Sequence, residues 1–365
     1  MMFKNIYNGK KVLITGHTGF KGSWLSTWLL HLGANVIGIS KDIPTKPSMF
    51  EELGLENNIQ HHSEDIRNFD ALNKIIKQEK PEFIFHLAAQ AIVSTSYSRP
   101  LETITSNVIG TTHILESLRL INHKCTLIVV TSDKAYDNVE QFWGYKENDS
   151  MGGKDIYSGS KGAAELVIKS YYHSFFKLPR SNVRLSVARA GNVIGGGDWA
   201  KDRIIVDTMV AWSKGEKVEI RSPNSTRPWQ HVLEPLSGYL SLGQQLQADI
   251  SLNGEGFNFG PRAEQNRTVQ ELLEDSCKHW NVRPENAFAV TGNSQFQESS
   301  LLKLNCDKAL SLLKWIPNLE YNETIRFTNE WYYSFYQNIV MSDKTLNQIQ
   351  EYQNVAKAKE LTWTE

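Results

Sequence analysis

The sequence predicts an α/β fold built on a doubly wound parallel sheet. Short apolar runs rich in β-branched residues alternate with stretches of helical periodicity through the first half of the chain. This alternation is typical of parallel strands that are covered by helices on both faces. A glycine-rich turn follows the first apolar run, in VLITGHTGFKG at residues 12–22. Strand, turn and helix in this order begin a βαβ unit, the building block of such sheets.

The expected elements follow one another in a regular order. In the first half, strands are expected at 12–15, 35–40, 83–88, 126–132 and 183–191, and helices at 23–32, 69–78, 107–120 and 158–176. In the second half, we expect a strand at 217–221 and helices at 204–214, 234–246, 268–280 and 322–337. This order predicts a doubly wound domain at 1–190, a smaller α/β lobe at 191–341 with some exchange of chain between the two, and a loosely attached polar tail at 342–365.

Composition excludes several classes of protein. The 365 residues include 39 basic and 40 acidic side chains, and a net charge of −1 gives no broad field to attract a nucleic acid or an anionic membrane. The spacing of Cys125, Cys277 and Cys306 suits neither a disulfide framework nor a zinc site, and the histidines show no metal-ligand spacing. No stretch is apolar enough for a signal peptide or a membrane span, so we expect a cytoplasmic protein without a bound metal.

The three glycines of the turn predict a dinucleotide site of the Rossmann type. Gly16 allows a sharp turn after the strand, Gly19 leaves room for a diphosphate beside the backbone, and Gly22 lets the next helix pack closely. The free N–H groups at the start of that helix then face the phosphates. His17 and Lys21 are unusual in such a turn. Either Lys21 adds a charge for the phosphates and His17 contacts them, or both side chains point to solvent.

The ends of the following strands predict the rest of the cofactor site. A carboxylate often ends the second strand and binds the ribose hydroxyls of NAD, but Ser40 occupies that position here. We expect NAD as the cofactor, and the serine leaves NADP open. Further contacts are expected from the turn, from two residues after another short run that would suit the adenine edge, from the end of the strand at 83–88 and from a supporting position at the start of the following helix: Phe20, Asp65, Ile66, Ala88, Ala89, Gln90 and Asn107.

A second motif predicts proton transfer. Tyr157 and Lys161 form YSGSK, so both side chains lie on one face of the expected helix. A lysine ammonium beside a phenol lowers the pKa of the phenol, which lets Tyr157 take a proton from a substrate hydroxyl while hydride leaves. The preceding strand ends in TSDK at 131–134, whose threonine or Ser132 can hydrogen-bond the reacting hydroxyl. Asp133 and Lys134 add an acid–base pair that oxidation of an alcohol does not require.

These motifs resemble those of the extended short-chain dehydrogenases, and within them the sugar-nucleotide 4,6-dehydratases. The resemblance extends from about Lys11 to Phe335. It rests on GHTGFKG (16–22), DI (65–66), HLAAQ (86–90), TSDKAYDN (131–138), YSGSK (157–161), RAGNVIGGGDW (189–199) and RPWQHVLEP (227–235). GHTGFKG and TSDK are similar to the CDP-glucose branch and differ from the relatives that use TDP- or GDP-sugars.

The resemblance implies a hydro-lyase that uses NAD catalytically. Tyr157, assisted by Lys161, removes the proton of the sugar 4-hydroxyl while the C4 hydride goes to NAD. A base then removes the acidified C5 proton, water leaves C6, and the hydride returns to C6 to give CDP-4-keto-6-deoxy-D-glucose. Asp133 is implied as the acid that protonates the 6-hydroxyl. Lys134 stands where TDP-sugar relatives have a glutamate base, and acts either as a base or as a stabiliser of the enolate or ketone.

A CDP-hexose substrate implies further residues and a biological role. Two phosphates and a pyrimidine call for local cations and aromatic walls. The expected substrate-binding residues are Arg189, Asn192, Trp199, Arg203, Arg227 and Trp229, with packing or surface roles as the alternative. The product is expected to supply a deoxysugar of a bacterial surface polysaccharide, such as the O-antigen of lipopolysaccharide.

Three alternatives stay open. The first is a dehydratase for another nucleotide hexose. A sugar-nucleotide 4-epimerase of the same fold would keep Tyr157 and Lys161 but has no use for Asp133. A non-catalytic dinucleotide sensor would need none of the three. The resemblance also implies that copies pair through the helices at 107–120 and 158–176, in a homodimer or a homotetramer.

Overall fold

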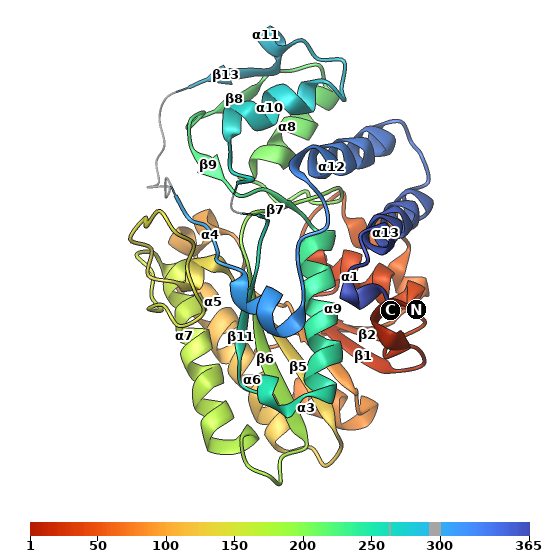
Figure 1. Ribbon diagram of the computed structural model, residues 1–365, viewed down its shortest axis with the longest axis vertical. Coiled ribbons are helices and arrows are strands. Elements are labelled where there is room, and N and C mark those ends of the chain that lie inside the picture. Colours follow the sequence, from red (N-terminus) through yellow and green to blue (C-terminus); the bar gives the residue numbers. More distant parts are fainter. Residues whose placement is uncertain (263, 292–300) are drawn as a thin grey trace.

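A seven-stranded parallel sheet forms the centre of the molecule, in the order β11-β6-β5-β4-β1-β2-β3, and confirms the predicted fold class (Figure 1). The computed structural model describes residues 1–262, 264–291 and 301–365. The strands are β1 (Lys11–Thr15), β2 (Asn35–Ser40), β3 (Gln60–Ser63), β4 (Phe83–His86), β5 (Cys125–Val130), β6 (Val183–Ala190) and β11 (Gly256–Phe259). The two edge strands, β3 and β11, were not expected. Because β11 comes from the second half of the chain, the two halves share the sheet.

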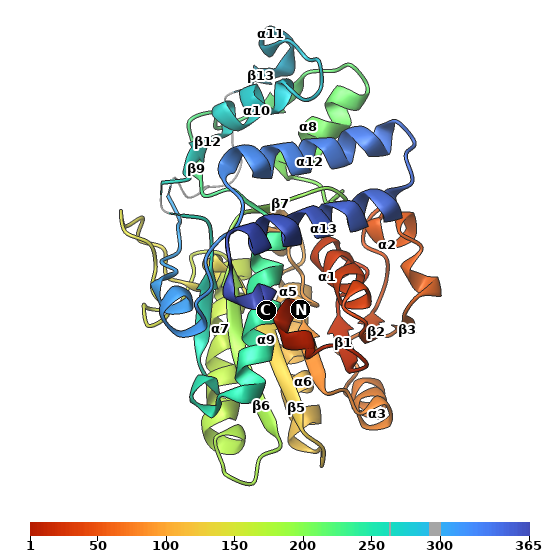
Figure 2. The same ribbon diagram turned by 45° about the vertical axis from the view of Figure 1, so that its right-hand side comes forward.

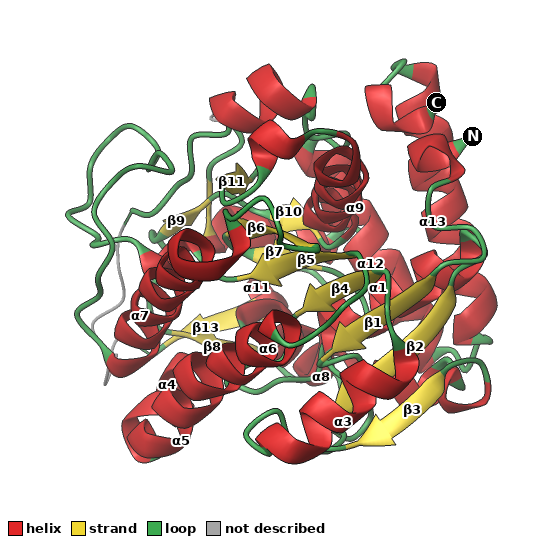
Figure 3. Cartoon of the chain, turned by 90° about the horizontal axis from the view of Figure 1, so that it is seen from below, coloured by secondary structure: helices red, strands yellow, loops and turns green. Residues whose placement is uncertain are grey.

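Helices cover both faces of the sheet (Figure 3). Leu13 of β1 packs in a core with α3, α6 and α7, whereas its neighbours Val12 and Ile14 pack in a second core with α1, α9 and α13. This alternation places one apolar side chain after another on opposite faces of the same strand. The covering helices are α1 (Phe20–His31), α3 (Phe69–Glu79), α6 (Gly110–Arg119), α7 (Ile156–Tyr171), α9 (Leu233–Ala248) and α13 (Met341–Ala358).

The helical segment between β4 and β5 is longer than expected. It starts at Val93 with α4 (Val93–Ser98), continues through α5 (Pro100–Ile104) and a π-helical turn, η3 (Thr105–Ile109), and ends with α6. The predicted start at residue 107 was therefore wrong. α4 ends before Pro100, at the non-helical Arg99, and Pro100 then begins α5, where its missing N–H would have had no partner in the helix.

A smaller lobe lies beyond the carboxyl ends of the strands, because β6 leads directly into a strand of this lobe (Figure 1). Its described residues form three two-stranded sheets. Its strands are β7 (Val193–Ile194) with β10 (Gln230–His231), β9 (Thr226–Arg227) with β12 (Arg267–Thr268), and β8 (Val218–Ile220) with β13 (Phe288–Val290). Its helices are α8 (Ile204–Ser213), α10 (Val269–Cys277), α11 (Pro284–Ala287) and α12 (Tyr321–Tyr336).

Short helical turns complete the described chain. They are η1 (Met2–Asn5), α2 (Met49–Glu52), η2 (Leu55–Asn57), η4 (Asp133–Ala135), η5 (Tyr172–Phe176), η6 (Ile250–Leu252), η7 (Ala309–Leu313) and η8 (Thr362–Thr364). Within the described ranges, no helix combines the length and the apolar character needed to cross a membrane.

The C-terminal segment is part of the core, so the expectation of a loosely attached tail was wrong. Figure 2 shows α13 lying against α1 and α12. The ring of Trp363 stacks on Phe3 with 5.1 Å between ring centres, and the hydroxyl of Tyr352 donates to Glu234 of α9. The backbone N–H of Lys4 donates to the carbonyl of Glu365. Buried residues spaced along one face of α13 fix the two chain ends together despite the polar composition of the segment.

Candidate active site

The turn between β1 and α1 requires glycine at two positions. Gly16 has a φ of +77°, and a Cβ there would lie 2.8 Å from the backbone nitrogen of Ala88. A Cβ at Gly22 would lie 2.2 Å from the carbonyl oxygen of Gly16. At Gly19, by contrast, a Cβ would meet only that oxygen at an ordinary 3.4 Å. The protein itself leaves room at Gly19, beside the start of α1, and this free space fits a diphosphate that approaches the backbone.

The side chain of His17 does not point toward this space or toward solvent, contrary to both expectations. Its ring packs against Gly38 of β2, with its Nε2 2.7 Å from Nδ1 of His61 and its Nδ1 3.0 Å from Oγ of Ser40. A Cβ at Gly38 would lie 2.4 Å from the imidazole ring, so glycine in β2 makes room for it. Burial and the adjacent His61 lower the pKa of His17 to about 4, which leaves the ring neutral at pH 7. His17 therefore brings no charge to a phosphate.

Lys21, in the first turn of α1, interacts electrostatically with charged residues of the catalytic group. Burial and the nearby guanidinium of Arg203 lower the pKa of Lys21 to about 8, and the carboxylate of Asp133 opposes this shift. Its neighbour Phe20 lies against the lobe, since a Cβ at Gly195 would come within 3.2 Å of the phenyl ring.

The end of β4 is tied to α7 through one side chain. Oδ1 of Asn107 accepts from the backbone nitrogen of Gln90 at 2.8 Å, and its Nδ2 donates to the carbonyl of Gln90 and to Oγ of Ser160. Asn107 thus supports this end of the strand from within η3, and it does not open a helix as expected. The backbone nitrogen of Ala88 donates to Oγ1 of Thr15, and Ala89 follows at the same end of the strand.

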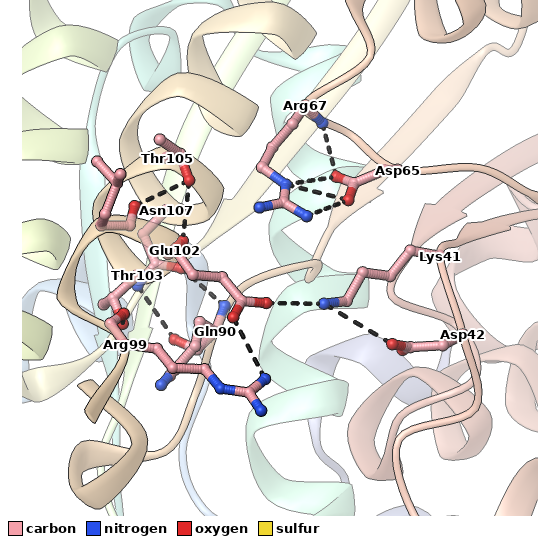
Figure 4. Close-up of polar contacts among 11 residues, drawn as sticks. Lys41, Asp42, Asp65, Arg67, Gln90, Arg99, Glu102, Thr103, Thr105 and Asn107 are labelled. Carbon is pink, nitrogen blue, oxygen red and sulfur yellow. Dashed lines mark hydrogen bonds and ion pairs between the residues drawn. The ribbon is translucent and has the colours of Figure 1, made fainter. Parts of the chain in front are cut away.

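The residues after β3 are engaged with their own neighbours (Figure 4). The carboxylate of Asp65 forms an ion pair with Arg67, with 2.6 Å between Oδ2 and Nη2, and this contact lowers the pKa of Asp65. Ile66 is buried against Gly110, where a Cβ would lie 2.4 Å from its Cδ1. An adenine contact by Asp65 would therefore compete with Arg67.

The catalytic residues expected from the two motifs come together at the end of β5. Ser132 is the N-cap of η4; its Oγ donates to Oδ1 of Asp133 at 2.9 Å and accepts from the backbone nitrogen of Lys134 at 3.2 Å. The side chain of Ser132 also acts on Tyr157 of α7 and lowers the pKa of its phenol. Nζ of Lys161 lies 6.0 Å from the centre of the Tyr157 ring.

Burial dominates the acid–base properties of this group. It raises the pKa of Tyr157 to about 12, which outweighs the lowering effect of Ser132, and it lowers the pKa of Lys161 to about 8. The expectation that Lys161 lowers the pKa of the phenol therefore misses the larger effect. Burial also raises the pKa of Asp133, against the charge of Lys134. The carboxyl group thus keeps its proton to a higher pH than an exposed aspartate, as a proton donor must.

Arg189, expected to bind substrate, holds the catalytic elements together instead. Its Nη2 lies 2.5 Å from Oε2 of Glu165, its Nε donates to Oε1, and its Nη1 donates to the hydroxyl of Tyr136. Oγ1 of Thr131 donates to the same carboxylate at 2.6 Å. We call these four residues the Glu165 network. It was missed from the sequence, although Glu165 follows Lys161 by one helical turn and Tyr136 follows TSDK.

The two tryptophans expected to stack on substrate lie in apolar packing. Trp199 packs against Trp331 and Phe335 of α12, with 5.7 and 4.8 Å between ring centres, and Trp229 is buried in the same core. The space around each ring is filled by protein, so neither offers a free face of the kind that stacking on a base needs.

The other expected substrate-binding residues lie in the lobe. Nη1 of Arg203 lies 2.5 Å from Oδ2 of Asp198, and its charge acts on Tyr157. The carbonyl of Asn192 accepts from the backbone nitrogen of Gln230, between β7 and β10. Arg227 pairs with Arg267 in the antiparallel contact of β9 and β12. Of these three, Arg203 is the one that the structure brings next to the catalytic group. In the described part of the chain, no cluster of His, Cys, Asp and Glu could hold a metal ion.

Known proteins share both the sequence and the fold. The family described as GDP-mannose 4,6 dehydratase matches residues 13–328. A CDP-glucose 4,6-dehydratase from Salmonella typhimurium is 46% identical over 91% of this chain and 93% of its own length. A structure of dTDP-glucose 4,6-dehydratase from Bacillus anthracis in complex with NAD has a TM-score of 0.75, with 20% identity over 91% of this chain and 99% of its own. The epimerase Mth375 from Methanothermobacter thermautotrophicus has a TM-score of 0.78, with 23% identity over 92% and 96%. The chain therefore belongs to the GDP-mannose 4,6 dehydratase family.

Proposed function

We propose that this chain converts CDP-D-glucose into CDP-4-keto-6-deoxy-D-glucose and water. The observation that carries the proposal is the place of Asp133, a buried carboxyl that accepts a hydrogen bond from Ser132, whose side chain also lowers the pKa of Tyr157. A reaction that only oxidises and reduces C4 has no use for an acid there, whereas loss of the 6-hydroxyl as water requires one. The relative named CDP-glucose 4,6-dehydratase supports the choice of cytidine.

The roles of the side chains follow from their contacts. Tyr157 accepts the proton of the 4-hydroxyl, and Ser132, whose side chain acts on the same phenol, positions that hydroxyl. A positive charge on Lys161 favours the phenolate when substrate excludes water. NAD, when bound, supplies the hydride acceptor and later the hydride donor of the cycle. The free space at Gly19 supports binding of its diphosphate.

Elimination uses the residues of η4. Asp133 gives its proton to the departing 6-hydroxyl, which the raised pKa of this buried carboxyl favours. Lys134 follows in the same turn, where its amine accepts the C5 proton and the ammonium group that results stabilises the enolate. Lys21 places further positive charge beside the same carboxyl.

The test is a comparison of substrates. The pure chain with NAD is incubated with CDP-, TDP-, GDP- and UDP-glucose, and the alkali-induced absorbance of a 4-keto-6-deoxy sugar is measured. We expect product from CDP-glucose at a rate well above that from the other three. Binding of the coenzyme without product from any of the four would contradict the proposal.

We also propose that two copies pair through α7, which overlaps the expected 158–176, and through α5, which precedes the expected 107–120 in the same helical segment. These helices lie side by side, and large apolar side chains on and beside them are exposed, among them Leu101 at 74% and Leu166 at 58%. Exposed apolar side chains on adjacent helices are typical of a surface that is buried on assembly. Light scattering of the chain at micromolar concentration is expected to give at least the mass of a dimer, and a monomeric mass would contradict this proposal. The cytoplasmic location and the supply of a surface deoxysugar stay predictions.

A further inference from the structure

A cluster of alternating charges lies where the adenosine ribose is expected (Figure 4). Ser40 ends β2, and Lys41 and Asp42 follow it. Figure 4 shows Lys41 reaching across to α5, with its Nζ 3.0 Å from Oε1 of Glu102 and 3.7 Å from Oδ2 of Asp42. Arg99 approaches the other oxygen of Glu102, with 3.4 Å between Nη1 and Oε2.

The end of the second strand is where such folds distinguish their coenzymes. A carboxylate there accepts from the 2′-hydroxyl of NAD, whereas a nearby cation accommodates the 2′-phosphate of NADP. Ser40 serves neither purpose directly, because it is buried and its Oγ lies 3.0 Å from Nδ1 of His17. The side chain of Lys41 is the first after β2 to be well exposed, at 44%.

Lys41 is better placed for this role than the two neighbouring arginines. Arg67 is held by Asp65 through its Nε and Nη2, and it follows β3 at the expected adenine edge. Arg99 precedes α5, is 68% exposed and makes only the longer contact to Glu102. Lys41 comes directly after the ribose position and is held by contacts that water can replace.

We propose that Lys41 recognises the 2′-position of the adenosine ribose, and that Glu102 holds its ammonium group when that position carries a hydroxyl. This inference rests on the proposed dinucleotide site. A phosphate monoester at the 2′-position draws the ammonium group away from Glu102, since a doubly charged phosphate attracts it more strongly than one carboxylate. The carboxylates of Asp42 and Glu102 repel that phosphate and limit its advantage. The chain therefore binds coenzymes with and without the 2′-phosphate and discriminates little between them.

The test measures binding alone and needs no sugar nucleotide. The fluorescence of NADH and of NADPH is titrated with the full-length chain, and the ratio of the NADPH Kd to the NADH Kd is the readout. We expect a ratio below about 10 for the unaltered chain and an increase of about tenfold for Lys41→Ala, the worth of one charge-assisted contact. Glu102→Gln is expected to lower the ratio by about threefold, because an exposed counter-ion is lost.

Lys10→Ala is the matched control. Lys10 forms an ion pair of 2.7 Å with Glu82 at 39% exposure of both side chains, but it precedes β1 at the opposite end of the sheet. This variant is expected to leave the ratio unchanged. Higher salt is expected to weaken NADPH binding more than NADH binding, because exposed charges are screened.

Several results would overturn the inference. A strong preference of the unaltered chain for NADH, an unchanged ratio in Lys41→Ala, or a change that follows Arg99→Ala instead would remove Lys41 from this role and leave the proposed dehydratase activity standing. Equal weakening of both coenzymes by salt would also contradict it. Failure of both reduced coenzymes to bind would overturn the inference and the proposed function together.

Discussion

Two groups of charged side chains lie at the carboxyl ends of one sheet, and they differ in burial. In the Glu165 network, Glu165 and Arg189 are 6% and 5% exposed and lie 2.5 Å apart. Beside β2, Lys41 and Glu102 are 44% and 25% exposed and lie 3.0 Å apart. Breaking the first pair leaves a buried charge, whereas water replaces the partners of the second. The catalytic side is therefore rigid, and the coenzyme side can exchange partners.

The largest expected effect is on the catalytic side. Tyr157→Phe removes the proposed proton acceptor and leaves the packing of the ring in place. We expect the rate of product formation from CDP-glucose to fall by a factor of about 10²–10⁴, because general-base catalysis contributes this much. Initial rates at saturating substrate measure it, with coenzyme fluorescence as a check on binding.

Tyr333→Phe is the matched control for this variant. Tyr333 lies on α12 with its side chain partly exposed and its ring against Trp280, away from the catalytic group. A rate within twofold of the unaltered chain is expected. A similar loss of rate in both variants would show that the hydroxyl of Tyr157 has no special role.

The Glu165 network is expected to show the largest effect on stability. Glu165→Gln leaves the guanidinium of Arg189 buried without its counter-charge, which costs about 3–5 kcal/mol in similar cases. We expect the free energy of unfolding in urea to fall by that amount. The double variant Glu165→Gln with Arg189→Met should recover part of the loss, because it removes the uncompensated charge. A loss below about 1 kcal/mol in the single variant would place this pair with ordinary surface pairs.

A variant of His17 tests whether burial, more than location in the fold, sets the energetic difference between the catalytic side and the coenzyme side. His17 lies on the coenzyme side, yet burial lowers its pKa to about 4, below the value of about 6.5 in an unfolded chain. The unfolded state therefore binds more protons between these values, and stability is lost as the pH falls from about 6.5 to about 4, by up to about 1.4 kcal/mol per pH unit.

The measurement compares urea unfolding of the unaltered chain and His17→Asn between pH 4 and pH 7. Burial raises the pKa of Glu234 to about 7, so its ionisation destabilises the folded protein as the pH rises. This opposite effect is the same in both proteins. The difference between the two curves therefore isolates His17. We expect a shallower loss in the variant below pH 6.5, and parallel curves would contradict the buried, neutral state of this ring.

The smallest expected effect belongs to the exposed pair. Lys41→Ala is expected to change the free energy of unfolding by less than about 1 kcal/mol, because both partners are solvated in either state. Urea unfolding at pH 7 measures this change. A loss as large as that of Glu165→Gln would remove the contrast between the two sides.

Much of the fold could be predicted, because apolar runs and glycines act locally. β1 and β2 follow from their apolar runs, and the turn between β1 and α1 follows from the steric needs of Gly16 and Gly22. The edge strand β3 could not be recognised, because its sequence QHHS carries no apolar pattern and pairs on one side only. β11 depends on pairing with β6, a contact far apart in the sequence. In α13 the buried residues are few among many polar ones, which hid its apolar face.

The candidate site was predictable where a motif fixes the geometry. The proximity of Tyr157, Lys161 and Ser132 follows from helical spacing and from the end of a strand. The direction of His17 was not predictable, because it depends on the space above Gly38 in a neighbouring strand. Arg189 was misassigned because its partner Glu165 lies on another element, and an arginine near a site serves packing as readily as binding.

The measurement that tests the central claim most directly follows one deuterium atom. CDP-glucose labelled with deuterium at C4 is incubated with the chain and NAD, and the product is examined by NMR and mass spectrometry. The account predicts loss of one water and a deuterium in the new methyl group at C6, because the hydride taken from C4 returns to C6. A product that has not lost water and carries the deuterium at C4 with inverted configuration is the product of a 4-epimerase. That result would contradict the account.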